Sequence, residues 1–181
     1  NIINIEGVSK AFDIRPLLAG VSLGVSEGER IGIVGRNGGG KSTLLKVLVG
    51  MLNQVDTAEP GATVRDVVIG SKKTHEWASD SGVREILAGL FGGYNSELMD
   101  RPFGSLSGGE KRRVGIAQLL IEPLDIILLD EPTNHLDVEG VAWLARHIRK
   151  RRDLAVVVIT HDRWFLDEVS DQMWEVIDGK V

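Results

Sequence analysis

The sequence contains no cysteine, which excludes disulfides and thiolate zinc sites and fits a reducing compartment such as the cytoplasm. It has no apolar run of the roughly 18 residues that a membrane span needs, and no basic segment leading into an apolar one near its start. We therefore expect neither a membrane span nor a secretory signal. The formal net charge of −5 lacks the positive excess of a nucleic-acid binder, so any such contact must be local.

Glycine, by contrast, is abundant. The chain holds 22 glycines among its 181 residues. A chain of this length suits one domain or two small ones. The glycines gather in two stretches, "GRNGGGKS" and "SLSGGE". Clusters of this kind indicate loops that contact phosphate groups more than they indicate disorder.

Apolar patterning predicts strands that alternate with helices, which is typical of a parallel sheet covered on both faces. An N-terminal β-layer is expected before the first glycine cluster, and short helices with a loop over 71–81 are expected in the middle of the chain. The predicted strands are 2–8, 21–25, 30–34, 126–129, 154–160 and one from 174 that leads into an Asp-Gly turn; the predicted helices are 42–50, 62–70, 81–93, 107–122 and 138–148.

The stretch Gly35–Ser42 matches the pattern GxxxxGK[ST]. Glycines let the backbone wrap around phosphate oxygens, Lys41 can reach the β- and γ-phosphates, and Ser42 can bind Mg²⁺. A glycine-rich turn that happens to precede Lys-Ser is the alternative. The apolar strand before the motif and the helix after it favour a phosphate-binding loop.

Two acidic residues, Asp130 and Glu131, end the apolar strand "IILL". A carboxylate in this place can hold Mg²⁺ through water, and a second one can orient or deprotonate a water molecule. Alone, the pair would more often be a solvated turn. A phosphate-binding loop in the same chain reverses that preference.

A third motif is "LSGGE", residues 106–110. Ser107 and Glu110 form a capping-box pattern, so a helix should begin here with two glycines in its first turn and with backbone N–H groups open to an anion. A plain helix cap is the alternative.

Taken together, "GRNGGGKST", "LSGGE", "IILLDE" and "THD" resemble, in order and context, the nucleotide-binding domain of ATP-binding cassette (ABC) proteins. The resemblance covers essentially the whole chain. It implies an α/β P-loop NTPase of ABC type, with a mostly parallel core sheet, flanking helices, an N-terminal antiparallel β-layer and a helical signature subdomain. Residues 1–55 and 115–181 would form the ATPase core, and residues 56–114 the helical subdomain.

The resemblance also implies the cofactors ATP and Mg²⁺, with the choice between ATP and GTP left open, and a role for each matching residue. Glu131 would be the catalytic base, with His161 and Gln54 near the γ-phosphate and the attacking water, and Asp137 would lie in the D-loop. Phe12 would stack on adenine, although a core aromatic is the alternative, as an exposed polar residue is for Gln54. The implied nucleotide-binding residues are Gly35, Arg36, Asn37, Gly38, Gly39, Gly40, Lys41, Ser42 and Thr43; the implied Mg²⁺ ligands are Ser42, Gln54 and Asp130.

In this family Ser107, Gly108, Gly109 and Glu110 belong to the signature that contacts the ATP of a second cassette. The active unit is then a head-to-tail pair, either with a second cassette of the same full-length chain or as a homodimer, and one domain alone hydrolyses ATP poorly. The chain would be a fragment of a longer protein with two cassettes.

The motifs "EPTNHLD" and "THDRWFLD", with Arg36 in the glycine loop, resemble those of the ABC-F branch, most of all those of the first cassette of Uup-like bacterial members. That likeness implies a cytoplasmic protein that associates with ribosomes and adjusts translation. The ATPase subunit of a membrane transporter and a DNA-associated cassette are the alternatives. The ABC-F motifs disfavour the transporter subunit, and the lack of a heptad run disfavours the DNA-associated cassette.

One departure from the family lies before Gln54, only 13 positions after Lys41. The family places a β-hairpin and a further strand in that interval. We therefore predict that residues found in the family are missing between Gly50 and Met51.

A last feature is the basic run from Arg146 to Arg152, which precedes the strand at 154–160. Positive charge at a helix C-terminus complements the helix dipole. Contact with ribosomal RNA phosphates is the alternative.

Overall fold

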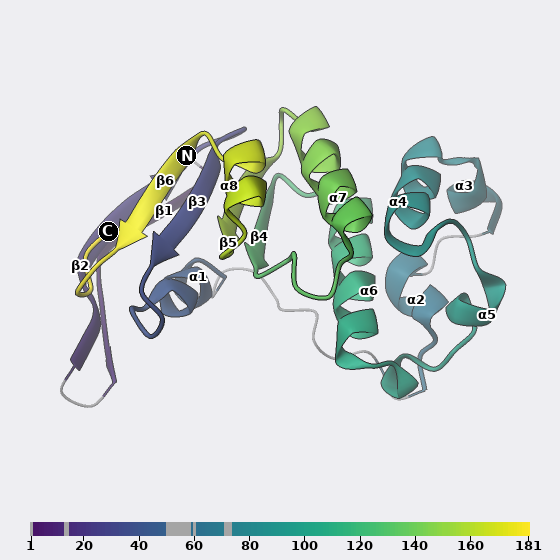
Figure 1. Ribbon diagram of the computed structural model, residues 1–181, viewed down its shortest axis with the longest axis horizontal. Helices are drawn as coiled ribbons and strands as arrows, with labels where there is room; N and C mark the ends of the chain where they lie inside the picture. The colour runs from purple at the N-terminus through teal and green to yellow at the C-terminus, as the bar shows by residue number, and fades with distance from the viewer. Residues whose placement is uncertain (1, 13–14, 50–58, 60, 71–73) are drawn as a thin grey trace. The chain divides into compact units, whose positions relative to one another are not determined.

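The computed structural model describes residues 2–12, 15–49, 59, 61–70 and 74–181 (Figure 1). The chain divides into two compact units. The first contains Asn1–Gln54, Asp125–Thr133 and Ala145–Val181, and the second contains Val55–Leu124 and Asn134–Leu144.

A four-stranded parallel sheet forms the centre of the first unit. Its strands are β3 (Arg30–Gly35), β4 (Ile126–Asp130), β5 (Ala155–Ile159) and β6 (Gln172–Val176), in the order β4-β5-β3-β6. All five residues of β5 are buried, as expected for a strand covered on both faces. The sequence prediction of a mostly parallel core sheet is confirmed.

An antiparallel pair, β1 (Ile3–Phe12) and β2 (Arg15–Val25), forms the expected N-terminal layer. Strand β2 begins earlier than the predicted start at residue 21, because Leu18, Pro16 and Arg15 continue the pairing with β1. Helix α1 (Lys41–Val49) follows β3. One hydrophobic core joins these elements to the sheet: Ile3, Ile5, Leu18, Val21, Val25, Ile31, Ile33, Leu44, Leu45, Leu48, Ile126, Ala155, Val157, Ile159 and Val176.

Helix α8 (Arg163–Val169) was not predicted from the sequence. Asp162 caps its first turn by accepting a hydrogen bond from the Phe165 backbone N–H. The helix packs against β3 at Gly32, where a Cβ would lie 2.9 Å from Leu166. Glycine in β3 therefore lets α8 lie close to the sheet.

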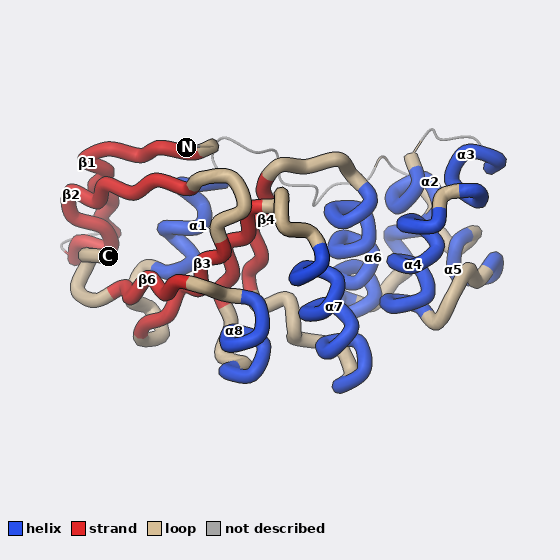
Figure 2. Tube along the Cα trace, turned by 90° about the horizontal axis from the view of Figure 1, so that it is seen from above, coloured by secondary structure: helices blue, strands red, loops and turns tan. Residues whose placement is uncertain are grey.

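Helices make up the second unit (Figure 2). They are α2 (Val64–Ile69), α3 (Thr74–Ser79), α4 (Ser81–Phe91), α5 (Ser96–Met99), the 3₁₀ helix η1 (Phe103–Ser105), α6 (Gly108–Ile121) and the first part of α7 (Val138–Lys150). The predicted loop over 71–81 is wrong, since α3 lies within it and buries Trp77. Helix α5 was also missed, because four residues are too few to show helical periodicity.

The boundary between the units differs from the expected one at residue 114. The second unit extends to Leu124 and also takes in Asn134–Leu144. The physical reason is α6, which packs against α2 and α4 and buries Val114, Ala117 and Leu120.

The turn after β6 has the predicted Asp-Gly form. Asp178 and Gly179 both have positive φ, 47° and 78°, and Ile177 pairs with Lys180 across the turn. Two left-handed residues are what a tight hairpin of this type needs. Among the described residues, no helix is long and apolar enough to cross a membrane.

Candidate functional site

Three of the sequence motifs follow parallel strands of the first unit. The glycine loop follows β3, Asp130 and Glu131 end β4, and His161 comes just after β5. Because β4, β5 and β3 are neighbours and parallel, these motifs share the carboxyl edge of the sheet. Ligands of open α/β sheets bind at this edge.

The glycine loop, Gly35–Thr43, has a backbone that only glycine can follow at its tightest points. Gly40 has φ 99°, and a Cβ there would lie 2.6 Å from the Leu17 carbonyl oxygen of β2. Gly35 has φ 146°, and a Cβ there would lie 2.5 Å from the Val176 carbonyl oxygen of β6. Glycine at these two positions therefore lets the loop pack directly against β2 and β6.

Lys41 is the first residue of α1 and is only 8% exposed. Its ammonium group donates hydrogen bonds to two carbonyls of the loop, Gly35 at 2.8 Å and Arg36 at 3.0 Å. The side chain thus folds back onto the start of the loop. It can exchange these carbonyls for phosphate oxygens without crossing to another part of the fold.

Glu131 adopts a left-handed backbone conformation, with φ 49°. Its N–H still donates to the Ile159 carbonyl at 2.7 Å, so the pairing with β5 continues past the end of β4. A left-handed non-glycine residue is uncommon and persists where the surrounding structure holds it, often at functional sites. The side chain of Glu131 is 22% exposed and can reach solvent.

The structure brings Glu131 and His161 together. The Glu131 Oε1 lies 3.6 Å from the His161 Nε2, a contact that is an ion pair only when the imidazole is protonated. Its Oε2 also accepts a hydrogen bond of 3.3 Å from the His161 backbone N–H. Behind them, the hydroxyls of Thr133 and Thr160 lie 3.1 Å apart and tie the ends of β4 and β5 together.

The donors on this edge suit Mg²⁺. Ser42 offers a hydroxyl and Asp130 a carboxylate, and Mg²⁺ is usually held by one or two such oxygens, water and substrate phosphates. Within the described part of the chain no group of three or more His, Cys, Asp or Glu residues could hold a metal by itself. The chemistry therefore fits a Mg²⁺ ion that arrives with a phosphate substrate.

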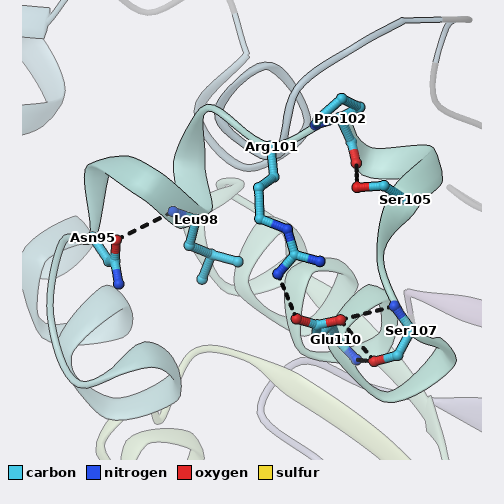
Figure 3. A network of polar contacts seen from close by, with 7 residues as sticks. All are labelled: Asn95, Leu98, Arg101, Pro102, Ser105, Ser107 and Glu110. Carbon is cyan, nitrogen blue, oxygen red and sulfur yellow. Dashed lines mark hydrogen bonds and ion pairs between the residues drawn. The ribbon is translucent and has the colours of Figure 1, made fainter.

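The signature motif lies in the second unit, at the start of α6 (Figure 3). The predicted capping box is confirmed: Ser107 is the N-cap, its hydroxyl accepts from the Glu110 N–H at 3.3 Å, and its own N–H donates to the Glu110 carboxylate at 2.8 Å. Arg101 donates to the other carboxylate oxygen at 2.8 Å. The backbone and side-chain hydrogen bonds from Ser107, followed by that from Arg101, lower the pKa of Glu110 to about 2.

Asp137 directly precedes α7 in the second unit, and its carboxylate accepts a hydrogen bond from the Gly140 N–H at 2.8 Å. The turn before it is held to α6 by Arg113, whose Nε and terminal nitrogen both donate to the His135 carbonyl, at 3.1 and 2.8 Å. Sequence reasoning missed Arg113. No pattern could reveal it, because its acceptor is a backbone carbonyl 22 residues away.

Two of the expected residues have no described side chain. Phe12 is the last residue of β1 and pairs with Arg15, and its contact with adenine stays a prediction. Gln54 lies outside the described residues, as does the junction of Gly50 and Met51.

Comparison with known families gives a match to the model described as "ABC transporter", over residues 18–58 and 48–134. The match comes in two pieces that overlap in the short interval after α1. The overlap, residues 48–58, includes the junction of Gly50 and Met51, where the sequence predicts a missing segment.

Two curated relatives align along nearly the whole chain. The chain is 30% identical to ABC transporter F family member 5 of Arabidopsis thaliana, over 99% of this chain and 28% of that protein. It is 34% identical to the energy-dependent translational throttle protein EttA of Escherichia coli K12, over 92% of this chain and 39% of that protein. The chain thus spans less than half the length of either relative.

Among solved structures, the chain is similar to a bacterial ABC transporter cassette, MJ0796, whose structure is dimeric. The TM-score is 0.75 at 23% sequence identity, covering 98% of this chain and 95% of that one. This likeness confirms the expected fold.

Proposed function

The chain belongs to the ABC transporter family, and from that premise we propose that it binds ATP with Mg²⁺ and hydrolyses it as one cassette of a pair. The observation that carries the proposal is the edge of the first unit's sheet, where a glycine loop with Lys41 follows β3 and Glu131 contacts His161 at 3.6 Å. These are the parts that phosphoryl transfer requires: a phosphate cradle, a cation and a base.

Each residue has a definite task in this proposal. Lys41 leaves the carbonyls of Gly35 and Arg36 and donates to the phosphates. Glu131 accepts the proton of the attacking water, and His161 orients that carboxylate. Mg²⁺, held by Ser42 and Asp130, would neutralise phosphate charge as the leaving group departs.

The signature motif acts on the nucleotide of the opposite cassette. The exposed start of α6, with Ser107 as its cap and Gly108 open to solvent, presents N–H groups and the positive end of a helix dipole to an anion. The dimeric form of the MJ0796 cassette supports such a pairing. A single copy then hydrolyses ATP slowly.

We place the chain in the ABC-F branch and propose that it acts on translation by binding ribosomes. The likeness to ABC transporter F family member 5 and to a translational throttle protein supports this, with both alignments covering more than nine-tenths of the chain. The motifs NHLD and HDRWFLD agree with it, and within the branch the first cassette of Uup-like proteins remains our proposed position.

Co-sedimentation tests the ribosome proposal. The Glu131→Gln variant, which binds ATP but lacks the base, should sediment with ribosomes in ATP and Mg²⁺ and should remain in the supernatant with ADP. The matched control is Glu131→Gln with Lys41→Ala, which loses the phosphate contact and should not sediment. Retention on DNA or on lipid vesicles, with no ribosome binding, would contradict the proposal.

We also propose that the chain lacks a segment that the family has between Gly50 and Met51. The family match comes in two pieces, and both of them cover this junction, since they overlap over residues 48–58. The alignment with ABC transporter F family member 5 spans 202 residues, more than the 181 of this chain, so the relative has residues without a counterpart. Inserting that relative's segment between Gly50 and Met51 should strengthen MgATP binding, whereas an unchanged or weaker affinity would contradict the idea.

A further inference from the structure

The turn Asn134–Asp137, which follows the proposed catalytic base in the chain, is fastened to the signature helix within the second unit. Arg113 lies on the second turn of α6, half-buried. Two nitrogens of its guanidinium donate to one acceptor, the His135 carbonyl, at 3.1 and 2.8 Å. Charged, forked donors of this kind make stronger and more directional hydrogen bonds than neutral ones.

The same turn touches the signature motif at a second point. A Cβ on Gly109 would lie 3.1 Å from the Cβ of His135 and 3.2 Å from its ring carbon Cγ. The imidazole therefore lies against the bare backbone of the signature. A Cβ at position 109 would be closer than ordinary van der Waals contact, so His135 would have to shift to admit it.

The backbone of the turn is held in a conformation that it would not choose alone. His135 has φ 70°, in the left-handed region, which costs a residue with a side chain free energy. The double hydrogen bond from Arg113 offsets that cost. At the end of the turn, Asp137 accepts from the Gly140 N–H and directly precedes α7.

We infer that Arg113 is a positioning residue, which locks the turn Asn134–Asp137 to the first turns of α6 so that both meet an opposing cassette as one rigid surface. The inference rests on the proposed pairing of two cassettes. Arg113 touches neither substrate nor metal in this scheme. It acts through His135 and Asp137, whose place relative to Ser107 and Gly109 it fixes.

Hydrogen exchange tests the contact without nucleotide. In Arg113→Ala, the backbone N–H groups from His135 to Val141 should exchange about tenfold faster than in the parent chain, while those of α6 keep their protection. Arg113→Lys, which keeps the charge but loses the fork, should give a smaller increase. The matched control is Arg84→Ala, an exposed arginine on α4, which should change neither region. Unchanged exchange in the turn of Arg113→Ala would overturn the inference.

Dimerisation tests the role. In a Glu131→Gln parent with ATP and Mg²⁺, Arg113→Ala should raise the dissociation constant of the dimer about tenfold, and Arg113→Lys should recover part of the loss. The affinity of the single chain for MgATP should stay within about twofold, because its phosphate contacts come from the glycine loop. Normal dimerisation of Arg113→Ala would overturn the role.

A parent that stays monomeric in ATP is a separate outcome. It would overturn the proposed pairing itself, and with it the part that Arg113 plays in pairing. The exchange measurement needs no dimer and would still decide whether Arg113 holds the turn.

Discussion

Arg30, the first residue of β3, is nearly buried at 9% exposure and caps the end of α7. One terminal nitrogen of its guanidinium donates toward the carbonyls of Ile148, Arg149 and Arg151, at 3.3, 3.2 and 3.0 Å. The last carbonyls of a helix have no partner within the helix. Two of these carbonyls also accept backbone hydrogen bonds, that of Ile148 from the Arg151 N–H at 3.1 Å and that of Arg151 from the Leu154 N–H at 3.4 Å. Replacing Arg30 by methionine, of similar length, removes the charged donor that all three carbonyls share.

The size of the effect follows from those contacts. A nitrogen with two hydrogens can make two good hydrogen bonds, each worth about 1.5 kcal/mol when the donor is charged, so Arg30→Met should lose about 3 kcal/mol of unfolding free energy. For a chain of this length, 1 kcal/mol shifts the midpoint of thermal unfolding by about 2–4 °C, which gives a fall of about 6–12 °C.

Thermal unfolding followed by circular dichroism measures the shift. Arg30→Lys, which keeps the charge and loses the fork, should fall between the parent and Arg30→Met. The matched control is Arg146→Met, an exposed arginine of α7, which should move the midpoint by less than about 2 °C. A midpoint for Arg30→Met within that same margin of the parent would refute the capping argument.

Three further predictions follow from single contacts. Gly89→Ala should lower the unfolding free energy by about 1–3 kcal/mol, because a Cβ at 89 would overlap the indole of Trp143; denaturant unfolding that matches the parent would contradict this packing. Gly40→Ala should weaken MgATP binding at least about tenfold in a fluorescent-nucleotide titration, because φ 99° and the 2.6 Å approach to β2 both exclude a Cβ. Gly38→Ala, with φ 75° and nothing within 4 Å, should weaken binding less. Equal losses of affinity in the two variants would contradict the steric explanation. The pKa of Glu110 is lowered from 4.5 to about 2, so its contribution to stability is present above about pH 4.5 and is lost as the pH falls toward 2. The difference in unfolding free energy between the parent and Glu110→Gln should therefore shrink as the pH falls over that window. A difference that stays constant would contradict the hydrogen bonds to Glu110.

Residues close together in the sequence were predictable because their partners lie within a few positions. The capping box of Ser107 and Glu110 spans three residues, the glycine loop is continuous, and the Asp-Gly turn at 178–179 needs only its own backbone. The apolar strands before Gly35 and Asp130 were found because both are continuous apolar runs. These predictions needed only the chemistry of residues that are neighbours in the sequence.

Contacts between distant segments could not be predicted from the sequence. The basic run after Arg146 was expected to complement the dipole of α7, and His147, Arg149 and Lys150 do lie in the last turn. Side-chain hydrogen bonds to that helix end also come from Arg30, 118 positions away from Ile148. Likewise, the sequence shows no link between Arg113 and His135, since a backbone carbonyl accepts from any donor that the fold brings near.

The claim that two cassettes act together has a direct measurement, the rate of phosphate release per chain as a function of chain concentration. We expect the rate per chain to rise with concentration as pairs form, and Glu131→Gln to abolish phosphate release at every concentration. A rate per chain that is independent of concentration, or that survives the loss of Glu131, would contradict the paired mechanism.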